Sequence, residues 1–295
     1  MRKLIAGLGL AITLALALTA CANSQARSPG DGAETSPAGI LIGAAEKTES
    51  AGSAHLAFYF SVQSADTAQS FTGDADVNFG NGDPATAEAH MRFAFPKSLG
   101  ENMGSMEMTL DAGPVIYMRS PIFTQMLGAP TPWIKIDPAT VPGMADQLGS
   151  LTGGQADPTG SLTMLYGLTD VEEVGIEQVD GASATHYRAT FDLTKALEQI
   201  PDANREALQQ AIDGIQQQTG GTDVSAMPID VWVDGDGYLK QFRYLFEIPG
   251  ETAGGGGSFG MTMTLSNVGV PVDIQPPPAD QVTDILDLAP TTASP

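Results

Sequence analysis

The chain has 295 residues, of which 35 are acidic and 13 basic, and its formal net charge is −22. Nucleic acid and anionic headgroups repel a surface this acidic, so we exclude DNA and RNA as partners. The chain has one cysteine, so no intrachain disulfide can form and an apolar core must stabilise the fold. The length suits one large domain or two small ones. A GC-rich genome would produce a similar acidic, Gly- and Ala-rich composition, so composition alone assigns no function.

The first residues have the layout of a secretory signal peptide. Arg2 and Lys3 precede an apolar run over residues 4–18 that contains no charged residue. An ordinary membrane-spanning helix needs about 20 apolar residues, and this run is shorter. We therefore predict that residues 1–20 are a signal peptide that is removed on export.

The end of the signal carries a cysteine motif. Residues 18–21 read Leu-Thr-Ala-Cys, which resembles the lipobox of bacterial lipoprotein precursors. The resemblance implies that Cys21 is acylated on sulfur and anchors the protein to the extracytoplasmic face of the cell membrane. The alternative is a plain secretory signal followed by a chance cysteine. Residues 21–37 are small, polar and contain Pro and Gly, so we predict a flexible tether.

After the tether the pattern predicts one helix and then a long series of strands. Ser36 and Pro37 provide an N-cap and first turn for a helix over 37–50. Period-two alternation then predicts strands over 56–62, 71–79, 90–95, 106–110, 115–120, 133–136, 171–180, 184–191, 229–233, 238–248 and 258–268. Turns are predicted at 81–84, 180–181 and 234–237, and further helices begin at Asp137, Asp157 and Asp192, with another over 208–215. The fold class is therefore α+β, with a loose C-terminal tail over 281–295.

The sequence offers no nameable enzyme site. His55, His90 and His186 are too far apart in sequence for a metal-ligand motif, and each lies in or beside a predicted strand, where we expect a satisfied ring. Nucleophile-elbow, P-loop, dinucleotide and zinc-protease motifs are absent from the sequence. Residues 234–237 alternate carboxylates with glycines, which suits either a calcium loop or a hairpin turn, and the spacing favours the turn. We expect no catalytic activity, no cofactor and no metal.

Methionines are frequent on the predicted apolar faces, and the chain contains twelve of them. Unbranched thioethers adapt to irregular or exchangeable ligands, although they also fill ordinary cores. Composition alone therefore leaves both interpretations open.

Several strand motifs occur in a characteristic order. They are the aromatic strand SAHLAFYF at 53–60, VIYM at 115–118 followed by PWIK at 132–135, VGIEQVDG at 174–181 with His186 and Tyr187, and VWVDGDG at 231–237. In this order, and with the cysteine motif, the mature chain resembles the LppX/LprAFG family of actinobacterial lipoproteins, which is similar in fold to the LolA/LolB carriers. The resemblance covers residues 38–280.

The resemblance implies a curved antiparallel half-barrel with helices packed on its concave face and an apolar cavity between the sheet and the helices. In the family this cavity holds the acyl chains of a lipid or glycolipid. Alternation then predicts the cavity-facing side chains as Phe58, Phe60, Val77, Phe79, Met91, Phe93, Met106 and Met108. The expected function is to carry such a lipid across the cell envelope. The expected partners are the lipid, the membrane through Cys21 and an export transporter, and the protein is expected to be a monomer. The alternative is a cell-surface or periplasmic adaptor lipoprotein that binds another protein and holds no ligand.

Overall fold

The structure is a computed structural model that describes residues 36–64, 67–80, 86–96, 104–113, 115–137, 139–140, 167–192, 226–248 and 257–288. Cys21, the turn at 81–84 and the helices predicted after Asp137, Asp157 and Asp192 and over 208–215 lie outside the described residues. Among the described helices, none is long and apolar enough to cross a membrane.

The first described element is the predicted helix, α2 (Pro37–Ser50). Its N-cap is Ser36, whose side-chain oxygen accepts a hydrogen bond from the Gly39 amide at 3.1 Å. Pro37 stands at the first helical position, where the missing N–H costs nothing. The cap and the helix bounds agree with the sequence prediction.

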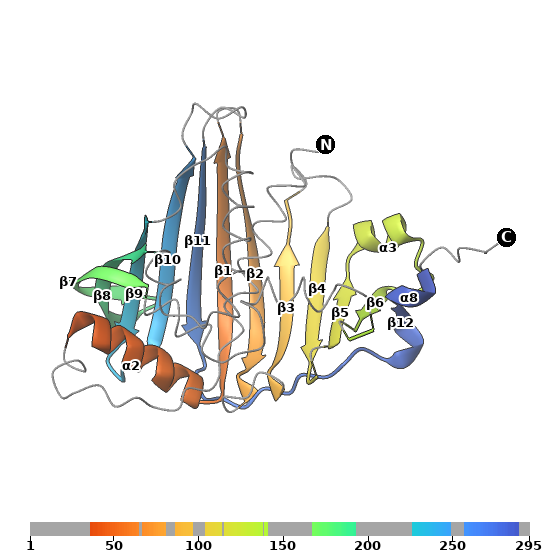
Figure 1. Ribbon diagram of the computed structural model, residues 1–295, viewed down its shortest axis with the longest axis horizontal. Coiled ribbons are helices and arrows are strands. Elements are labelled where there is room, and N and C mark those ends of the chain that lie inside the picture. Colours follow the sequence, from red (N-terminus) through yellow and green to blue (C-terminus); the bar gives the residue numbers. More distant parts are fainter. Residues whose placement is uncertain are drawn as a thin grey trace.

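Twelve strands of the described chain form one sheet, in the order β12-β6-β5-β4-β3-β2-β1-β11-β10-β9-β8-β7. Their bounds are β1 Ser53–Ser64, β2 Ala68–Asn78, β3 Glu88–Ala94, β4 Ser105–Asp111, β5 Val115–Arg119, β6 Trp133–Ile136, β7 Leu168–Val179, β8 Ala182–Asp192, β9 Ala226–Asp234, β10 Leu239–Ile248, β11 Gly257–Ser266 and β12 Val282–Asp284. All neighbours are antiparallel except β12 and β6. The sheet is open, with β12 and β7 at its edges, and Figure 1 shows β7–β9 turned relative to β1–β5. The α+β half-barrel prediction is confirmed.

Two hairpins follow the predicted turn chemistry. Asp180 and Gly181 connect β7 to β8 with φ values of 49° and 78°, the left-handed conformation that a two-residue hairpin requires. Between β9 and β10, the Asp234 carboxylate accepts hydrogen bonds from the amides of Asp236 and Tyr238 at 3.0 and 2.9 Å. This carboxylate stabilises its own turn, which agrees with a hairpin.

Three further elements differ from the sequence prediction. Helix α3 (Pro121–Leu127) follows β5 and ends at Gly128, whose φ is 64°. A loose tail was expected from residue 281, but Val282–Asp284 forms β12 beside β6 and continues into α8 (Ile285–Leu288). The hydroxyls of Thr131 and Thr283 are hydrogen-bonded, and Lys135 pairs with Asp284 at 3.5 Å. These long-range contacts hold residues 282–284 to the sheet edge.

One face of the sheet is apolar across most of its width. Strand register places inward-facing residues of neighbouring strands opposite one another, as in the pairs Phe60–Met261 and Met91–Met108. The buried side chains of this face form a single cluster that includes Leu41 and Ala44 of α2. Helix α2 contacts β7, β9 and β10, and Figure 1 shows it lying across that side of the sheet. The fold therefore has one long apolar face, whose side chains are buried, with helix α2 at one flank.

Candidate functional site

The candidate site is the apolar face of strands β1–β4 and β11. All eight side chains predicted to face a cavity lie in the apolar cluster, with exposed fractions between 0% and 6%. They are Phe58, Phe60, Val77, Phe79, Met91, Phe93, Met106 and Met108. Alternation therefore places all eight on the buried apolar face of the sheet. Their role in binding a ligand stays a prediction.

Aromatic rings run across the strands of this face. Phe60 stacks on Phe71 with ring centroids 4.7 Å apart, and it lies 6.3 Å from both Phe93 and Phe259. Phe71 in turn lies 5.2 Å from Phe95. Rings at these distances and tilts gain favourable contacts beyond the area they bury. Together they make an aromatic cluster that is buried and apolar.

Methionines flank these rings. Met91 pairs with Met108, and Met106 pairs with Phe93, across β3 and β4. Met261 and Met263 continue the surface on β11, opposite Phe60 and Phe58. Flexible thioethers beside rigid rings can repack around hydrocarbon of differing shape. The composition of the face therefore suits an acyl chain.

On this face of β2, glycine and alanine leave room for the side chains of the neighbouring strands. A Cβ at Gly73 would lie 2.5 Å from Cδ1 of Phe93 and 2.8 Å from the backbone oxygen of Arg92. Ala75, two residues on, is fully buried between Leu56 and Met91 in the register. Small residues here let the neighbouring rings lie flat against the sheet.

The opposite, outer face of the sheet is polar. Arg92 pairs with Asp74, and Arg119 pairs with Glu107, each across two neighbouring strands. The histidine rings also have partners, with His55 Nδ1 at 2.8 Å from Asp76 and His90 Nδ1 at 2.9 Å from Thr109. Burial and then the nearby Arg92 lower the pKa of His90. The expectation of satisfied rings is therefore confirmed for these two residues.

His186 belongs to a compact cluster on the outer face that sequence reasoning missed. Its ring stacks on Trp232 with centroids 4.3 Å apart, and its two nitrogens lie 3.0 Å from Glu177 and 2.7 Å from Asp230. Arg243 lies over the Trp232 ring and donates to Asp230 at 2.9 Å. The direct pairing of His186 with Trp232 across β8 and β9 creates this cluster. No group of three or more potential ligands suitable for a metal ion occurs within the described ranges.

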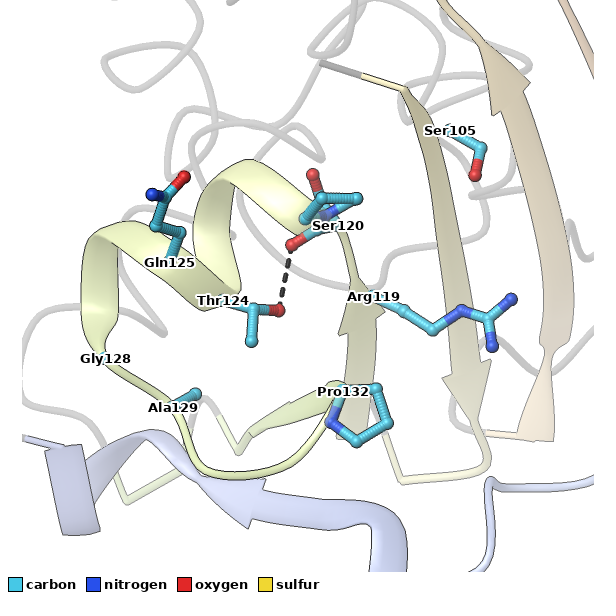
Figure 2. A pocket seen from close by; sticks show the side chains of 9 residues that line it. Ser105, Arg119, Ser120, Thr124, Gln125, Gly128, Ala129 and Pro132 are labelled. Atoms are coloured by element: carbon cyan, nitrogen blue, oxygen red, sulfur yellow. Dashed lines mark hydrogen bonds between the residues drawn. The ribbon is translucent and has the colours of Figure 1, made fainter. Parts of the chain in front are cut away.

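A cavity of about 660 Å³ lies where α3 meets the ends of β4 and β5. Figure 2 shows that hydroxyl and amide side chains surround it, and Thr124 donates a hydrogen bond to the Ser120 carbonyl at 2.9 Å. It is lined by Ser105, Arg119, Ser120, Pro121, Thr124, Gln125, Gly128, Ala129 and Pro132. None of the predicted cavity residues belongs to this lining. Arg119 follows Met118 in β5, and Met118 packs against the apolar cluster, so the alternation directs Arg119 to the outer face.

Tyr244 is a second residue that the sequence analysis did not single out. It lies on β10 with its ring 6.0 Å from Phe242 and from Phe259, and it is 7% exposed. The signal that could have identified its position is the same alternation, because Phe242 and Tyr244 stand two residues apart in one strand.

One known protein and several solved structures are similar to this chain. No family model matches the sequence. An uncharacterised 31.2 kDa protein of Streptomyces griseus is 28% identical over 145 residues, which are 49% of this chain and 43% of that protein. The match thus spans less than half the length of that relative.

Among solved structures, lipoprotein LppX of Mycobacterium tuberculosis is 15% identical, with a TM-score of 0.48 over 81% of this chain and 98% of that one. LprF of Mycobacterium bovis is 16% identical, with a TM-score of 0.46 over 82% and 96%. A LolA superfamily protein of Nitrosomonas europaea is 9% identical, with a TM-score of 0.26 over 77% and 93%. At these values no residue's role is carried over. In fold, the chain is similar to LppX and LprF, which are members of the LppX/LprAFG family that the strand motifs predicted.

Proposed function

We propose that this chain is a lipoprotein of the cell envelope that holds the acyl chains of a lipid or glycolipid against its apolar face and carries them across the envelope. The observation that supports this proposal best is the continuous, buried apolar face of aromatic and methionine side chains over β1–β4 and β11. Helix α2 contacts the sheet at β7, β9 and β10, to one side of that face.

The energetic case rests on burying hydrocarbon. Removing apolar surface from water gains about 25 cal/mol for each Å², so an acyl chain gains several kcal/mol on a matching apolar face. In the described strands β1–β4 and β11, no charged residue occupies an inward-facing position of the alternation. A polar or charged ligand would gain nothing comparable there.

The anchor is the second part of the proposal. Acylation of Cys21 would place several hydrocarbon chains in the membrane, and more than one chain is needed for durable attachment. The 21–37 tether would let the folded residues 38–280 stand off the bilayer. A lipid could then move between the bilayer and the apolar face over a short distance.

The anchor is tested by the variant Cys21→Ser in a host that processes bacterial lipoproteins. We expect wild-type protein to incorporate labelled fatty acid and to enter the detergent phase, and Cys21→Ser to do neither. Ser24→Ala, a substitution in the tether just beyond the cysteine, is the control and should behave as wild type. Incorporation of label into Cys21→Ser would contradict the assignment of the anchor.

The carrier role is tested on the full chain carrying Cys21→Ser, so that anchor lipid does not contribute. Purified protein is extracted with organic solvent, and the lipid per protein is measured by mass spectrometry. Ala75→Phe adds a ring to the apolar face. The control, Ala57→Phe, adds the same ring at an exposed position on the outer face of the neighbouring strand β1. We expect lipid with the parent protein and with Ala57→Phe, and much less with Ala75→Phe.

The adaptor alternative predicts that the same samples contain no bound lipid. If the parent protein yields no lipid and binds no apolar dye, the carrier proposal is wrong. Circular dichroism of Ala75→Phe checks that it remains folded, because an added ring in a packed region often costs about 1–3 kcal/mol.

A further inference from the structure

Tyr244 places a buried hydroxyl among apolar side chains of the sheet's inner face. Its backbone pairs with Met261 on β11 and with Ile229 on β9. Its ring lies 6.0 Å from the rings of Phe242 and Phe259. These neighbours present hydrocarbon, ring carbon and thioether to the tyrosine.

The Tyr244 hydroxyl has no hydrogen-bond partner in the described part of the chain. Native proteins pair nearly all buried side-chain polar atoms, so an unpaired one needs an explanation. Burial raises the pKa of this phenol, which therefore keeps its proton. A neutral phenol has one O–H donor to offer, and it requires an acceptor oxygen.

Few kinds of molecule could supply an acceptor for the Tyr244 hydroxyl. It must reach a buried position among aromatic rings, so it must belong to a molecule that is largely apolar. A pure hydrocarbon supplies no acceptor, and an isolated ionic headgroup is costly to bury away from water. A carbonyl oxygen at the end of a hydrocarbon chain satisfies both conditions, because the chain is apolar and the oxygen accepts a hydrogen bond from the phenol.

We propose that Tyr244 donates a hydrogen bond to the carbonyl oxygen of an acyl group whose hydrocarbon lies on the adjoining apolar face. This inference rests on the proposed lipid-binding function and specifies the part of the lipid that is recognised. Tyr244 sets the position of the acyl carbonyl, and the rings and methionines of β11 and β1 bind the chain beyond it. The carbonyl can come from an ester or from a fatty acid in its neutral, protonated form, and both then present a carbonyl acceptor.

The test compares three probes on the full chain carrying Cys21→Ser, with and without Tyr244→Phe. Hexadecane has no acceptor, methyl palmitate has an ester carbonyl, and palmitic acid has a carboxyl group. Each probe is titrated as a competitor of a bound apolar fluorescent dye. Tyr59→Phe, which removes a hydroxyl from a half-exposed ring on the outer face, is the matched control.

We expect Tyr244→Phe to weaken the binding of methyl palmitate, of palmitic acid or of both by about 3- to 10-fold, the loss of one neutral hydrogen bond. Hexadecane should bind both proteins equally, and Tyr59→Phe should match the parent for every probe. A loss for methyl palmitate alone identifies an ester as the source of the carbonyl. A loss for palmitic acid alone identifies a free acid.

The same samples separate the failure of this inference from failure of the proposed function. If all probes bind the parent and Tyr244→Phe equally, Tyr244 recognises no carbonyl, while lipid binding stands. If no probe binds the parent, the proposed function is itself wrong. Thermal unfolding of ligand-free protein adds a further readout, since removing an unpaired hydroxyl should leave Tm unchanged or raise it. A clear fall in Tm would show that the hydroxyl is bonded within the chain and would overturn the inference.

Discussion

Thr48 of α2 and Leu239 of β10 are joined by a hydrogen bond, in which the Leu239 amide donates to the Thr48 hydroxyl at 2.9 Å. The same hydroxyl donates to the Ala44 carbonyl at 2.7 Å, and Thr48 is 3% exposed. The preceding residue, Lys47, places its ammonium group over the Tyr238 ring, 4.6 Å from the centroid. These contacts fix the C-terminal end of α2 to the start of β10 and set where the helix crosses the sheet.

Thr48→Val should therefore destabilise the protein. The substitution keeps the shape of the side chain but leaves the Leu239 amide without its acceptor, which costs about 1–3 kcal/mol. Thr48→Ser retains the hydroxyl and should lose less. Urea denaturation of both variants measures the free energies of unfolding. Equal stability of Thr48→Val and wild type would show that this bond does not hold the helix.

Gly73→Ala should also be destabilising, for a steric reason. Its Cβ would lie 2.5 Å from a ring carbon of Phe93 and 2.8 Å from a backbone oxygen, and the backbone cannot give way cheaply. We expect a cost of about 1–3 kcal/mol. Gly43→Ala is the matched control, because that exposed position in α2 has nothing within 4 Å of the added carbon. It should stabilise the helix by up to about 1 kcal/mol. Thermal unfolding of the two variants should shift in opposite directions.

The cluster around His186 predicts a pH dependence of stability. Hydrogen bonds from Trp232 and then from His186 lower the pKa of Glu177. Burial of Asp230 opposes its ionisation, but hydrogen bonds from Arg243 and His186 outweigh that effect and lower its pKa. Carboxyl groups with lowered pKa values stabilise the fold above their ordinary values, here 4.5 and 3.8, and this stabilisation is lost as the pH falls through the lowered values.

The double variant Glu177→Gln and Asp230→Asn isolates this contribution from the other carboxylates of the chain. We expect it to be less stable than wild type at neutral pH, and the gap to close at a pH below those ordinary values. Urea unfolding of both proteins across this range measures the gap. A gap that stays constant on acidification would mean that the cluster contributes no pH-dependent stability.

The strands and hairpins could be predicted from the sequence because their signals are local. Alternation in β1–β4 identified both the strands and their apolar faces, and Asp180-Gly181 identified the turn between β7 and β8. The short helix α3 also had local signals, with Pro121 at its start and Gly128 at its end, but its seven residues make less than two turns, too few to establish a helical period. Periodicity was the main criterion for a helix, which explains the omission.

Features that depend on pairing between distant segments could not be predicted in the same way. The three residues of β12 pair with β6 in parallel, and nothing in three residues specifies a partner about 150 positions away. His186 and Trp232 become neighbours through the register of β8 and β9. The unpaired hydroxyl of Tyr244 is likewise a property of its surroundings in three dimensions, as far as the chain is described. Alternation could place these side chains on a face, but it could not supply their neighbours.

The most direct test of the account asks where a hydrocarbon chain lies on the protein. A fatty acid carrying a photoreactive diazirine on its chain is bound to the full chain with Cys21→Ser, irradiated, and mapped by tandem mass spectrometry. We predict adducts on the apolar face, at residues such as Phe58, Met91 and Met108, and their loss when unlabelled fatty acid is added in excess. Adducts confined to outer-face residues such as Tyr117, or no adducts that excess fatty acid displaces, would contradict the claim that this face binds lipid.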